Sequence, residues 1–253
     1  DLAVNSAGAC STAAVFLNNS VPGSENATFG PRQDFDTGSN AADIASADLD
    51  GDGKPDLAVV NQNIVCSTGF SVSMLLNGTS PRSSAATFSV SDLRVGYSPL
   101  SVAIGDLNED SRPDLVVGIR DCWSWYYGPP SVSVFFNTTS PGATIPSFAQ
   151  AGSYIVGSGC INSVNVALAD INGDGRVDLI ASNSDENTVS VFTNQTPLGA
   201  SQATFAPKVD LLTGASPVKF AATDLNGDGR PDLVAPNFGS NTISILTNTT
   251  PMG

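Results

Sequence analysis

Asp224-Leu-Asn-Gly-Asp-Gly-Arg-Pro-Asp232 places oxygen-bearing side chains at positions 1, 3, 5 and 9 of a nine-residue stretch, with glycines at positions 4 and 6. In so short a loop, alternate side chains can point inward around one cation, together with the backbone carbonyl of position 7. Glycine allows the backbone angles that a tight curl needs. The stretch therefore predicts a loop that binds Ca²⁺ through oxygen atoms.

Four copies of the pattern argue against an acidic turn that binds nothing. The copies predict about four Ca²⁺ sites, in each of which position 7 contributes its backbone carbonyl. The predicted ligand residues are Asp48, Asp50, Asp52, Lys54 and Asp56; Asp106, Asn108, Asp110, Arg112 and Asp114; Asp170, Asn172, Asp174, Arg176 and Asp178; and Asp224, Asn226, Asp228, Arg230 and Asp232. In the second copy Glu109 and Ser111 replace the glycines. We expect that loop to differ in geometry and to be the weakest site.

These loops account for most of the acidity of the chain. The formal charge is −14, and the loops hold thirteen ligand carboxylates, four in the first and three in each of the others. Four bound Ca²⁺ ions would leave a charge of about −6. This balance argues against a nucleic-acid partner or an anionic membrane. No run is long and apolar enough to span a bilayer.

An internal repeat surrounds each loop. A small-residue segment enters the loop at 41–49, 101–107, 165–171 and 219–225, and an apolar segment leaves it at 56–60, 114–117, 178–181 and 232–235. A third segment alternates polar and apolar residues at 71–77, 131–137, 188–194 and 242–248. A fourth carries a phenylalanine: Phe29, Phe88, Phe148 or Phe205.

Four short strands per repeat, with no helical periodicity, predict an all-β fold made of four-stranded antiparallel blades, a β-propeller. Small residues suit a first strand crowded near a central axis, continuous apolar character suits a covered second strand, and alternation suits a third strand nearer the rim. We expect one domain over 1–253, with repeats at about 1–40, 41–100, 101–164, 165–217 and 218–253.

The loop motif followed by Asn241-Thr-Ile-Ser-Ile-Leu246 resembles the FG-GAP/VCBS repeat, the repeat of the integrin α-subunit propeller, bacterial surface proteins and some fungal lectins. The resemblance covers essentially the whole chain. It implies calcium loops between the first and second strands of each blade, on one face, with binding usually on the other face. It does not imply one activity, because the family hosts adhesion, sugar binding, scaffolding and enzyme accessory roles.

The first and last repeats are incomplete. Asp1-Leu-Ala-Val matches the start of the second segment, and Pro251-Met-Gly253 matches Pro197-Leu-Gly199, the turn after the third segment. The first repeat therefore lacks its first strand and the last lacks its fourth. We expect either an excerpt of a larger propeller, for example a seven-bladed one, or strands supplied by another molecule in head-to-tail self-association.

Three sets of residues outside the loops are of functional interest. Trp123, Trp125, Tyr126 and Tyr127 form an aromatic loop that could bind a ligand or pack on its own blade. Cys10, Cys66, Cys122 and Cys160 are expected to form disulfides on the face opposite the loops, where Cys10–Cys66 and Cys122–Cys160 are one of three pairings. Six glycosylation sequons begin at Asn18, Asn26, Asn77, Asn137, Asn194 and Asn248, although copying of a good turn former also explains four of them.

Catalysis is not expected, because the chain has no histidine, no G-x-S-x-G elbow and no phosphate loop. Low-affinity calcium loops, sequons and cysteines favour a secreted or cell-surface protein. We predict a non-catalytic adhesion or recognition module for a glycan or protein. The alternatives are a structural subunit of an extracellular filament and an accessory domain of a secreted enzyme.

Overall fold

The computed structural model describes residues 1–6, 11–63, 70–120, 128–158 and 164–250. They form two compact units, residues 1–96 with 139–147 and residues 97–138 with 148–253. Each unit is described by itself. None of the described residues belongs to a helix with the length and apolar character that a membrane span requires.

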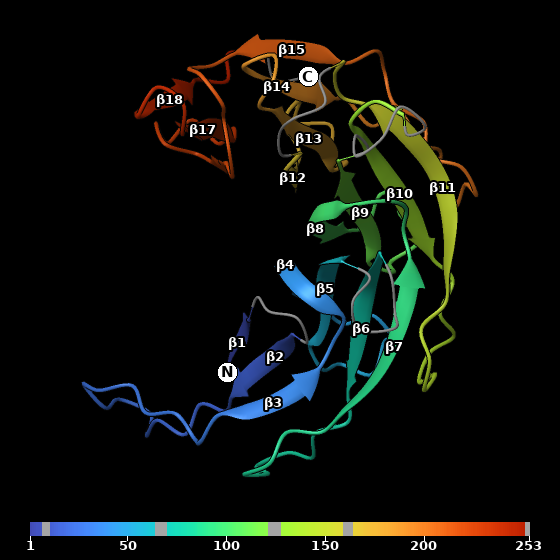
Figure 1. Ribbon diagram of the computed structural model, residues 1–253, viewed down its shortest axis with the longest axis vertical. Coiled ribbons are helices and arrows are strands. Elements are labelled where there is room, and N and C mark those ends of the chain that lie inside the picture. The colour runs from blue at the N-terminus through green and yellow to red at the C-terminus, as the bar shows by residue number, and fades with distance from the viewer. Residues whose placement is uncertain (7–10, 64–69, 121–127, 159–163, 251–253) are drawn as a thin grey trace. The chain divides into compact units, whose positions relative to one another are not determined.

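Unit 1 holds two antiparallel sheets (Figure 1). The first has the order β1-β2-β3, from β1 (Leu2–Asn5), β2 (Thr12–Phe16) and β3 (Gln33–Asp36). The second has the order β4-β5-β6-β7, from β4 (Ser39–Ala47), β5 (Asp56–Asn63), β6 (Ser71–Asn77) and β7 (Phe88–Arg94). Each strand pairs with the next one in the chain, as in a meander.

Unit 2 holds three further antiparallel sheets with the same sequential order. The first contains β8 (Pro99–Gly105), β9 (Asp114–Ile119), β10 (Ser131–Asn137) and β11 (Phe148–Ile155). The second contains β12 (Val166–Ala169), β13 (Asp178–Asn183), β14 (Thr188–Phe192) and β15 (Val209–Leu212). The third contains β16 (Ala221–Thr223), β17 (Asp232–Asn237) and β18 (Thr242–Leu246).

The predicted blade architecture is confirmed. The fold is all-β, with five antiparallel sheets in the predicted strand order, and the first and last sheets have three strands each. Each predicted phenylalanine of the fourth segment pairs with the asparagine that ends the third, as in Asn77↔Phe88 and Asn194↔Phe205. In unit 2 the first strands of successive sheets contact each other, β8 with β12 and β12 with β16. This arrangement is typical of blades.

Small residues near the first strands are explained by these contacts. A Cβ atom added to Gly105 would lie 2.8 Å from the side chain of Leu168 in the next sheet. A Cβ on Gly118 would lie 2.3 Å from the backbone oxygen of Val164. Both approaches are closer than a side chain tolerates, so the sequence has glycine where the sheets of unit 2 approach each other.

The segments with alternating residues form the third strand of their sheets, as predicted. Every residue of β10 and β14 is buried, including the polar positions of the alternating pattern. The sheet β4–β7 shows how such polar side chains are accommodated, since they bond to one another across the strands. Asn61 of β5 donates to Ser73 of β6 at 2.8 Å, and Ser73 donates to Asp92 of β7 at 2.6 Å. In the four-stranded sheets the alternation therefore separates a hydrogen-bonded face from an apolar face, and exposure begins at the fourth strand, as in β7.

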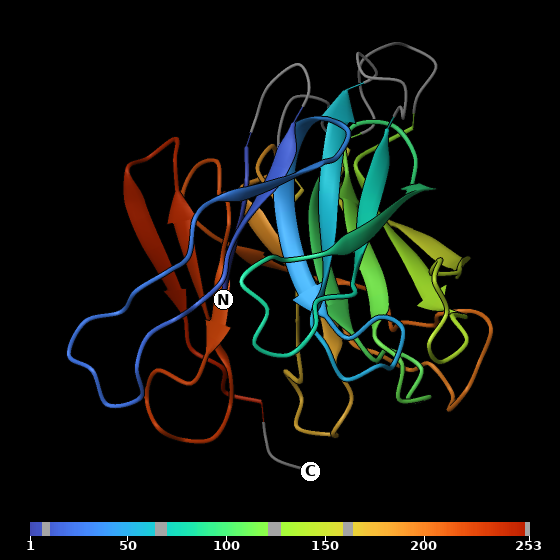
Figure 2. The same cartoon turned by 90° about the horizontal axis from the view of Figure 1, so that it is seen from below.

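The nine-residue loops join the first and second strands of their sheets, as the sequence predicts. In unit 1 the loop 48–56 joins β4 to β5, and in unit 2 the loops 106–114, 170–178 and 224–232 occupy the same place. In the three four-stranded sheets the connection from the third to the fourth strand returns to this end, so the loop and that connection are neighbours (Figure 2).

Candidate metal centre

The first aspartate of each loop organises the turn. Oδ1 of Asp48 accepts hydrogen bonds from the backbone N–H of Gly51 at 2.8 Å and Asp52 at 3.1 Å, and Oδ2 accepts one from Gly53 at 2.8 Å. Asp170 and Asp224 accept the same three bonds in their loops. The loop backbone is therefore held around one carboxylate, which preorganises the remaining oxygen atoms.

Loop 48–56 brings three carboxylates together. Oxygen atoms of Asp48, Asp50 and Asp56 all lie within 4.8 Å of one another. Clustered carboxylate oxygens are the donor set that Ca²⁺ prefers, and the loop offers neither nitrogen nor sulfur side-chain ligands. The residues present therefore fit a calcium ion. In the other loops asparagine replaces the aspartate at position 3, so amide oxygen takes the place of one carboxylate.

In three of the four loops the aspartate at position 5 forms an ion pair with the basic residue at position 7. Lys54 lies 2.7 Å from Asp52, Arg112 lies 2.7 Å from Asp110, and Arg230 pairs with Asp228. Position 7 thus places a counter-charge beside the loop carboxylates. These pairs are partly exposed, so each contributes little to stability.

The aspartate at position 9 is buried and crosslinks the sheet. Oδ2 of Asp114 accepts the N–H of Leu107 at 2.9 Å, and Oδ1 accepts the N–H of Asn137 at 2.9 Å. The equivalent pair of bonds occurs at Asp56, Asp178 and Asp232. Sequence reasoning assigned this residue to the metal alone, although the asparagine that ends the third segment of every repeat was a signal of the second role.

Burial raises the pKa of Asp114 to about 6, and the two backbone N–H groups only partly oppose it. Burial also raises the pKa of Asp56 and Asp178. A folded-state pKa above the unfolded value means that protonation favours the folded state, and that this stability is lost as pH rises through the folded pKa. Hydrogen bonds from Lys54 and Arg230 lower the pKa of Asp52 and Asp228. The stability that these two carboxylates contribute is lost only when the pH falls through their lowered pKa values.

We therefore expect the metal-free chain to become more stable as pH falls from about 7.5 to about 5. With excess calcium the trend should weaken or reverse, because protons compete with Ca²⁺ for the same carboxylates. Thermal unfolding in EDTA and in calcium across this range measures both slopes. A metal-free melting temperature that falls steadily with acidification would contradict the assignment of buried, proton-binding aspartates.

The second loop follows the same course as the others despite its missing glycines. Glu109 and Ser111 have φ values of 57° and 67°, close to the 74° and 86° of Gly51 and Gly53. The expected departure of loop geometry is therefore not seen in these angles. The cost is backbone strain, since residues with a Cβ are disfavoured at positive φ.

We expect Glu109→Gly with Ser111→Gly to stabilise the chain by about 1–2 kcal/mol, after the greater flexibility of glycine in the unfolded state is subtracted. The ion pair lost with Glu109 is a 3.6 Å contact with Arg176 on the surface and adds little. Urea unfolding in EDTA isolates the backbone effect from metal binding. Ala143→Gly, at a partly exposed position that follows the turn 141–142 outside the loops, serves as the control and should be neutral or destabilising.

The asparagine that ends the third segment of the repeat holds the loop end of the sheet together. Nδ2 of Asn194 donates to the carbonyl of Val177 in its own loop at 3.0 Å and to that of Leu107 in the preceding loop at 2.9 Å. Its Oδ1 accepts the N–H of Thr196 at 2.9 Å. Asn248 repeats all three bonds, reaching Ile171 in the preceding loop. The Asn-x-Thr pattern is thus a structural turn.

This role makes glycosylation of the buried sequons incompatible with the fold. Asn137 and Asn194 are only 1% and 2% exposed, whereas Asn18 and Asn26 are exposed. We expect a folded protein from a glycosylating host to carry sugar at the exposed sequons and none at the buried pair. Peptide mass spectrometry after enzymatic deglycosylation in heavy-oxygen water measures site occupancy. Full occupancy at Asn194 in correctly folded protein would contradict the structure.

The aromatic loop and the cysteines lie outside the described residues. Trp123, Trp125, Tyr126, Tyr127 and all four cysteines (Cys10, Cys66, Cys122 and Cys160) fall in the gaps of the described ranges. Their roles remain predictions.

Comparison with known proteins places the loops in a family. The model of the FG-GAP-like repeat matches residues 1–59 and 170–235, which include three of the four loops and leave out the one with Glu109 and Ser111. Comparison with curated proteins gives no significant match.

Two solved structures show low similarity to the chain. A Photorhabdus luminescens Tc holotoxin pore is 18% identical, with a TM-score of 0.41 over 98% of this chain and 11% of that one. An Agrocybe aegerita lectin, described as recognising non-reducing terminal N-acetylglucosamine, is 13% identical, with a TM-score of 0.39 over 98% of this chain and 80% of that one. The chain thus spans about a tenth of the length of the toxin chain.

Proposed function

Since this chain is an FG-GAP-like repeat protein, we propose that it is a non-catalytic, calcium-stabilised propeller module that recognises a glycan or a protein outside the cell. The observation that carries the calcium assignment is the group of Asp48, Asp50 and Asp56, whose oxygen atoms converge within 4.8 Å. Like charges so close repel one another unless a cation lies among them. The same loop framework recurs at the other three copies, which supports about four sites.

A hollow on the last sheet supports recognition at the end opposite the loops. It is lined by Phe238, Asn241 and Ile243 at the turn between β17 and β18, and β17 leads away from the loop 224–232. The side chain of Phe238 is prominent, with the residue 78% exposed. An exposed aromatic ring beside amide and hydroxyl groups suits the apolar face and polar edges of a sugar.

A glycan array probed with the calcium-loaded chain tests this function. We expect selective binding that Phe238→Ala weakens at least about tenfold, as for an aromatic residue at the centre of an interface. Leu198→Ala is the matched control, because Leu198 is also 71% exposed in unit 2 but follows β14 at the loop end. No glycan bound, or equal loss in both variants, would contradict a sugar site here. Bound glycans recovered unchanged would support the absence of catalysis.

A structural subunit is the second candidate, and one observation favours it. The residues of β18 are largely exposed, with Ile243 at 67% and Ile245 at 61%, whereas every residue of the equivalent β14 is buried. An uncovered apolar sheet face invites a further sheet, and repeated contacts of this kind build filaments. Electron microscopy of the native material distinguishes filaments from isolated modules.

A further inference from the structure

A turn formed by residues 194–200, in the connection from β14 to β15, is attached to two of the loops in unit 2. On one side it bonds to the loop of its own sheet, residues 170–178. Oδ1 of Asp178 accepts the N–H of Asn194 at 2.8 Å, and the guanidinium of Arg176 donates to a backbone carbonyl of the turn at 3.1 Å. Both partners are predicted ligand residues, at positions 7 and 9, so this loop holds the turn in place.

On its other side the turn holds the loop 106–114 of the preceding sheet. The N–H of Gly199 donates to the carbonyl of Asn108 at 2.7 Å, and Nδ2 of Asn108 donates to the carbonyl of Ala200 at 3.3 Å. Oδ1 of Asn108 is directed into its own loop, where it accepts the N–H of Asp110 at 3.2 Å. Asn108 is only 3% exposed. The turn therefore orients the side chain that the sequence predicts as the position 3 ligand.

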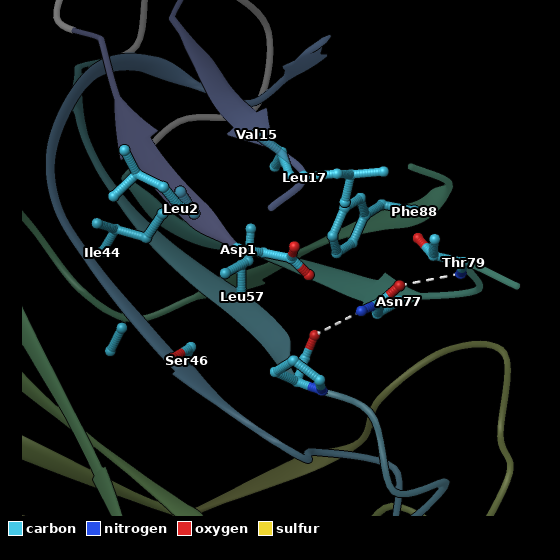
Figure 3. A pocket seen from close by; sticks show the side chains of 13 residues that line it. Asp1, Leu2, Val15, Leu17, Ile44, Ser46, Leu57, Asn77, Thr79 and Phe88 are labelled. Carbon is cyan, nitrogen blue, oxygen red and sulfur yellow. Dashed lines mark hydrogen bonds between the residues drawn. The ribbon is translucent and has the colours of Figure 1, made fainter. Parts of the chain in front are cut away.

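The loop of unit 1 has the backbone part of this contact without the side-chain part. There the N–H of Gly142 donates to the carbonyl of Asp50, also at position 3, at 2.9 Å. An aspartate has no N–H group on its side chain with which to bind the turn further. The asparagine that begins such a connection is held alike in both units. Figure 3 shows Asn77, whose Oδ1 accepts the N–H of Thr79 at 2.9 Å, as Asn194 accepts that of the residue two positions on.

The additional contacts support the loop with the least favourable backbone. Glu109 and Ser111 adopt φ values of 57° and 67°, which a residue with a Cβ disfavours. The carboxylate of Glu109 also lies 3.6 Å from the guanidinium of Arg176. Contacts from outside the loop offset this strain only while the turn itself is fixed. The order of the loop 106–114 therefore depends on the order of the loop 170–178.

We propose that the loops 106–114 and 170–178 bind calcium cooperatively, with the turn 194–200 as the element that couples them. When calcium orders Arg176 and Asp178, the turn is fixed, and it holds the position 3 ligand of the other loop ready. That loop then loses less conformational freedom on binding, which raises its affinity. Linkage requires the same factor in the opposite sense. The proposal rests on the calcium assignment of the proposed function and requires no glycan.

Nuclear magnetic resonance of the 253-residue chain during a calcium titration reports on the two loops separately. The N–H groups of Ser111 and Gly175 each donate to the first aspartate of their own loop at 2.8 Å, so their signals follow its occupancy. Asp174→Ala removes a predicted ligand from the loop of Gly175. We expect the calcium dissociation constant read from Ser111 to rise at least about fivefold, the lower end of typical coupling between sites. The N–H of Gly199 should also exchange faster with solvent, because the turn is loosened.

Asp228→Ala is the matched control, because it removes the same position 5 carboxylate from the loop 224–232. Among the described residues, that loop makes no hydrogen bond to the turn 194–200. The dissociation constant read from Ser111 should therefore change by less than about twofold. An equal rise in this control and in Asp174→Ala would overturn the coupling, because the effect would then be general.

The reciprocal variant keeps the proposal testable if Asp174→Ala fails to fold. Asp110→Ala removes the position 5 carboxylate of the loop 106–114 and should weaken the binding read from Gly175 at least about fivefold. Unchanged affinity at the remaining loop overturns the coupling and leaves the calcium assignment intact. Signals of Ser111 and Gly175 that do not respond to calcium in the parent chain overturn the calcium assignment and the coupling together.

Discussion

Chelation of calcium should lower the melting temperature of this chain by more than about 15 °C. A ligand at 100 times its dissociation constant stabilises the folded state by about 2.7 kcal/mol per site, and a chain of this size shifts by about 2–4 °C per kcal/mol. Several loops contribute, and without metal the carboxylates of Asp48, Asp50 and Asp56 are left within 4.8 Å of one another. Differential scanning calorimetry in calcium and in EDTA measures the difference.

Salt provides the control for this experiment. If the loss arose only from general repulsion among acidic groups, sodium chloride at about 1 M, where charges are screened beyond about 3 Å, would restore most of the stability. We expect partial recovery with sodium chloride and full recovery with calcium at low ionic strength. An unchanged melting temperature in EDTA would show that the loops are acidic turns that hold themselves together without metal.

Asp56→Ala should destabilise the chain even without calcium, by about 2–6 kcal/mol. The residue is fully buried, and its two oxygen atoms accept the N–H groups of Leu49 at 2.7 Å and Asn77 at 2.7 Å. Removing the carboxylate leaves two backbone donors unpaired, at about 1–3 kcal/mol each. Urea unfolding in EDTA measures this cost apart from any effect on the metal.

Asp50→Ala is the matched control, because Asp50 belongs to the same cluster of three carboxylates. Among the described residues its side chain accepts one hydrogen bond, from the backbone N–H of Asp52. In EDTA its substitution should be nearly neutral or stabilising, since it removes charge repulsion. In calcium it should abolish binding at this loop. Equal effects of the two variants in EDTA would show that position 9 acts as a metal ligand alone.

Most of the fold was predictable because the nine-residue motif sets the alignment of the repeats, and the alignment sets the positions of the strands. Once the loop 224–232 and its copies were aligned, strands such as β6 (Ser71–Asn77) and β10 (Ser131–Asn137) followed to the residue. The burial of their polar positions was not predictable in this way. Whether Ser73 faces water or Asp92 depends on the neighbouring strand, and local alternation does not encode that neighbour.

Residues with two roles explain what sequence reasoning missed at the site. A carboxylate at position 9 looks like a ligand from its spacing, whereas its bond to Asn137 spans a whole hairpin and requires the folded sheet to be seen. Likewise, the sequence of a sequon predicts attachment of a glycan. Only the folded structure shows that the side-chain amide of Asn194 donates hydrogen bonds to two backbone carbonyls. Glu109 and Ser111 show the converse, since the sheet imposes glycine-like angles on residues that do not favour them.

The asparagine bridges of unit 2 give the repeats a direction. Asn194 binds the loop of the repeat before it, and Asn248 does the same one repeat later, so each loop supports the sheet that follows. We therefore expect that loss of a bound ion from the loop 170–178 would loosen the carbonyl of Ile171 and destabilise the last sheet. Such nearest-neighbour coupling ties the stability of each loop to that of the sheet after it, in both directions. The stability of the final repeat should accordingly report on the occupancy of the loop 170–178 before it.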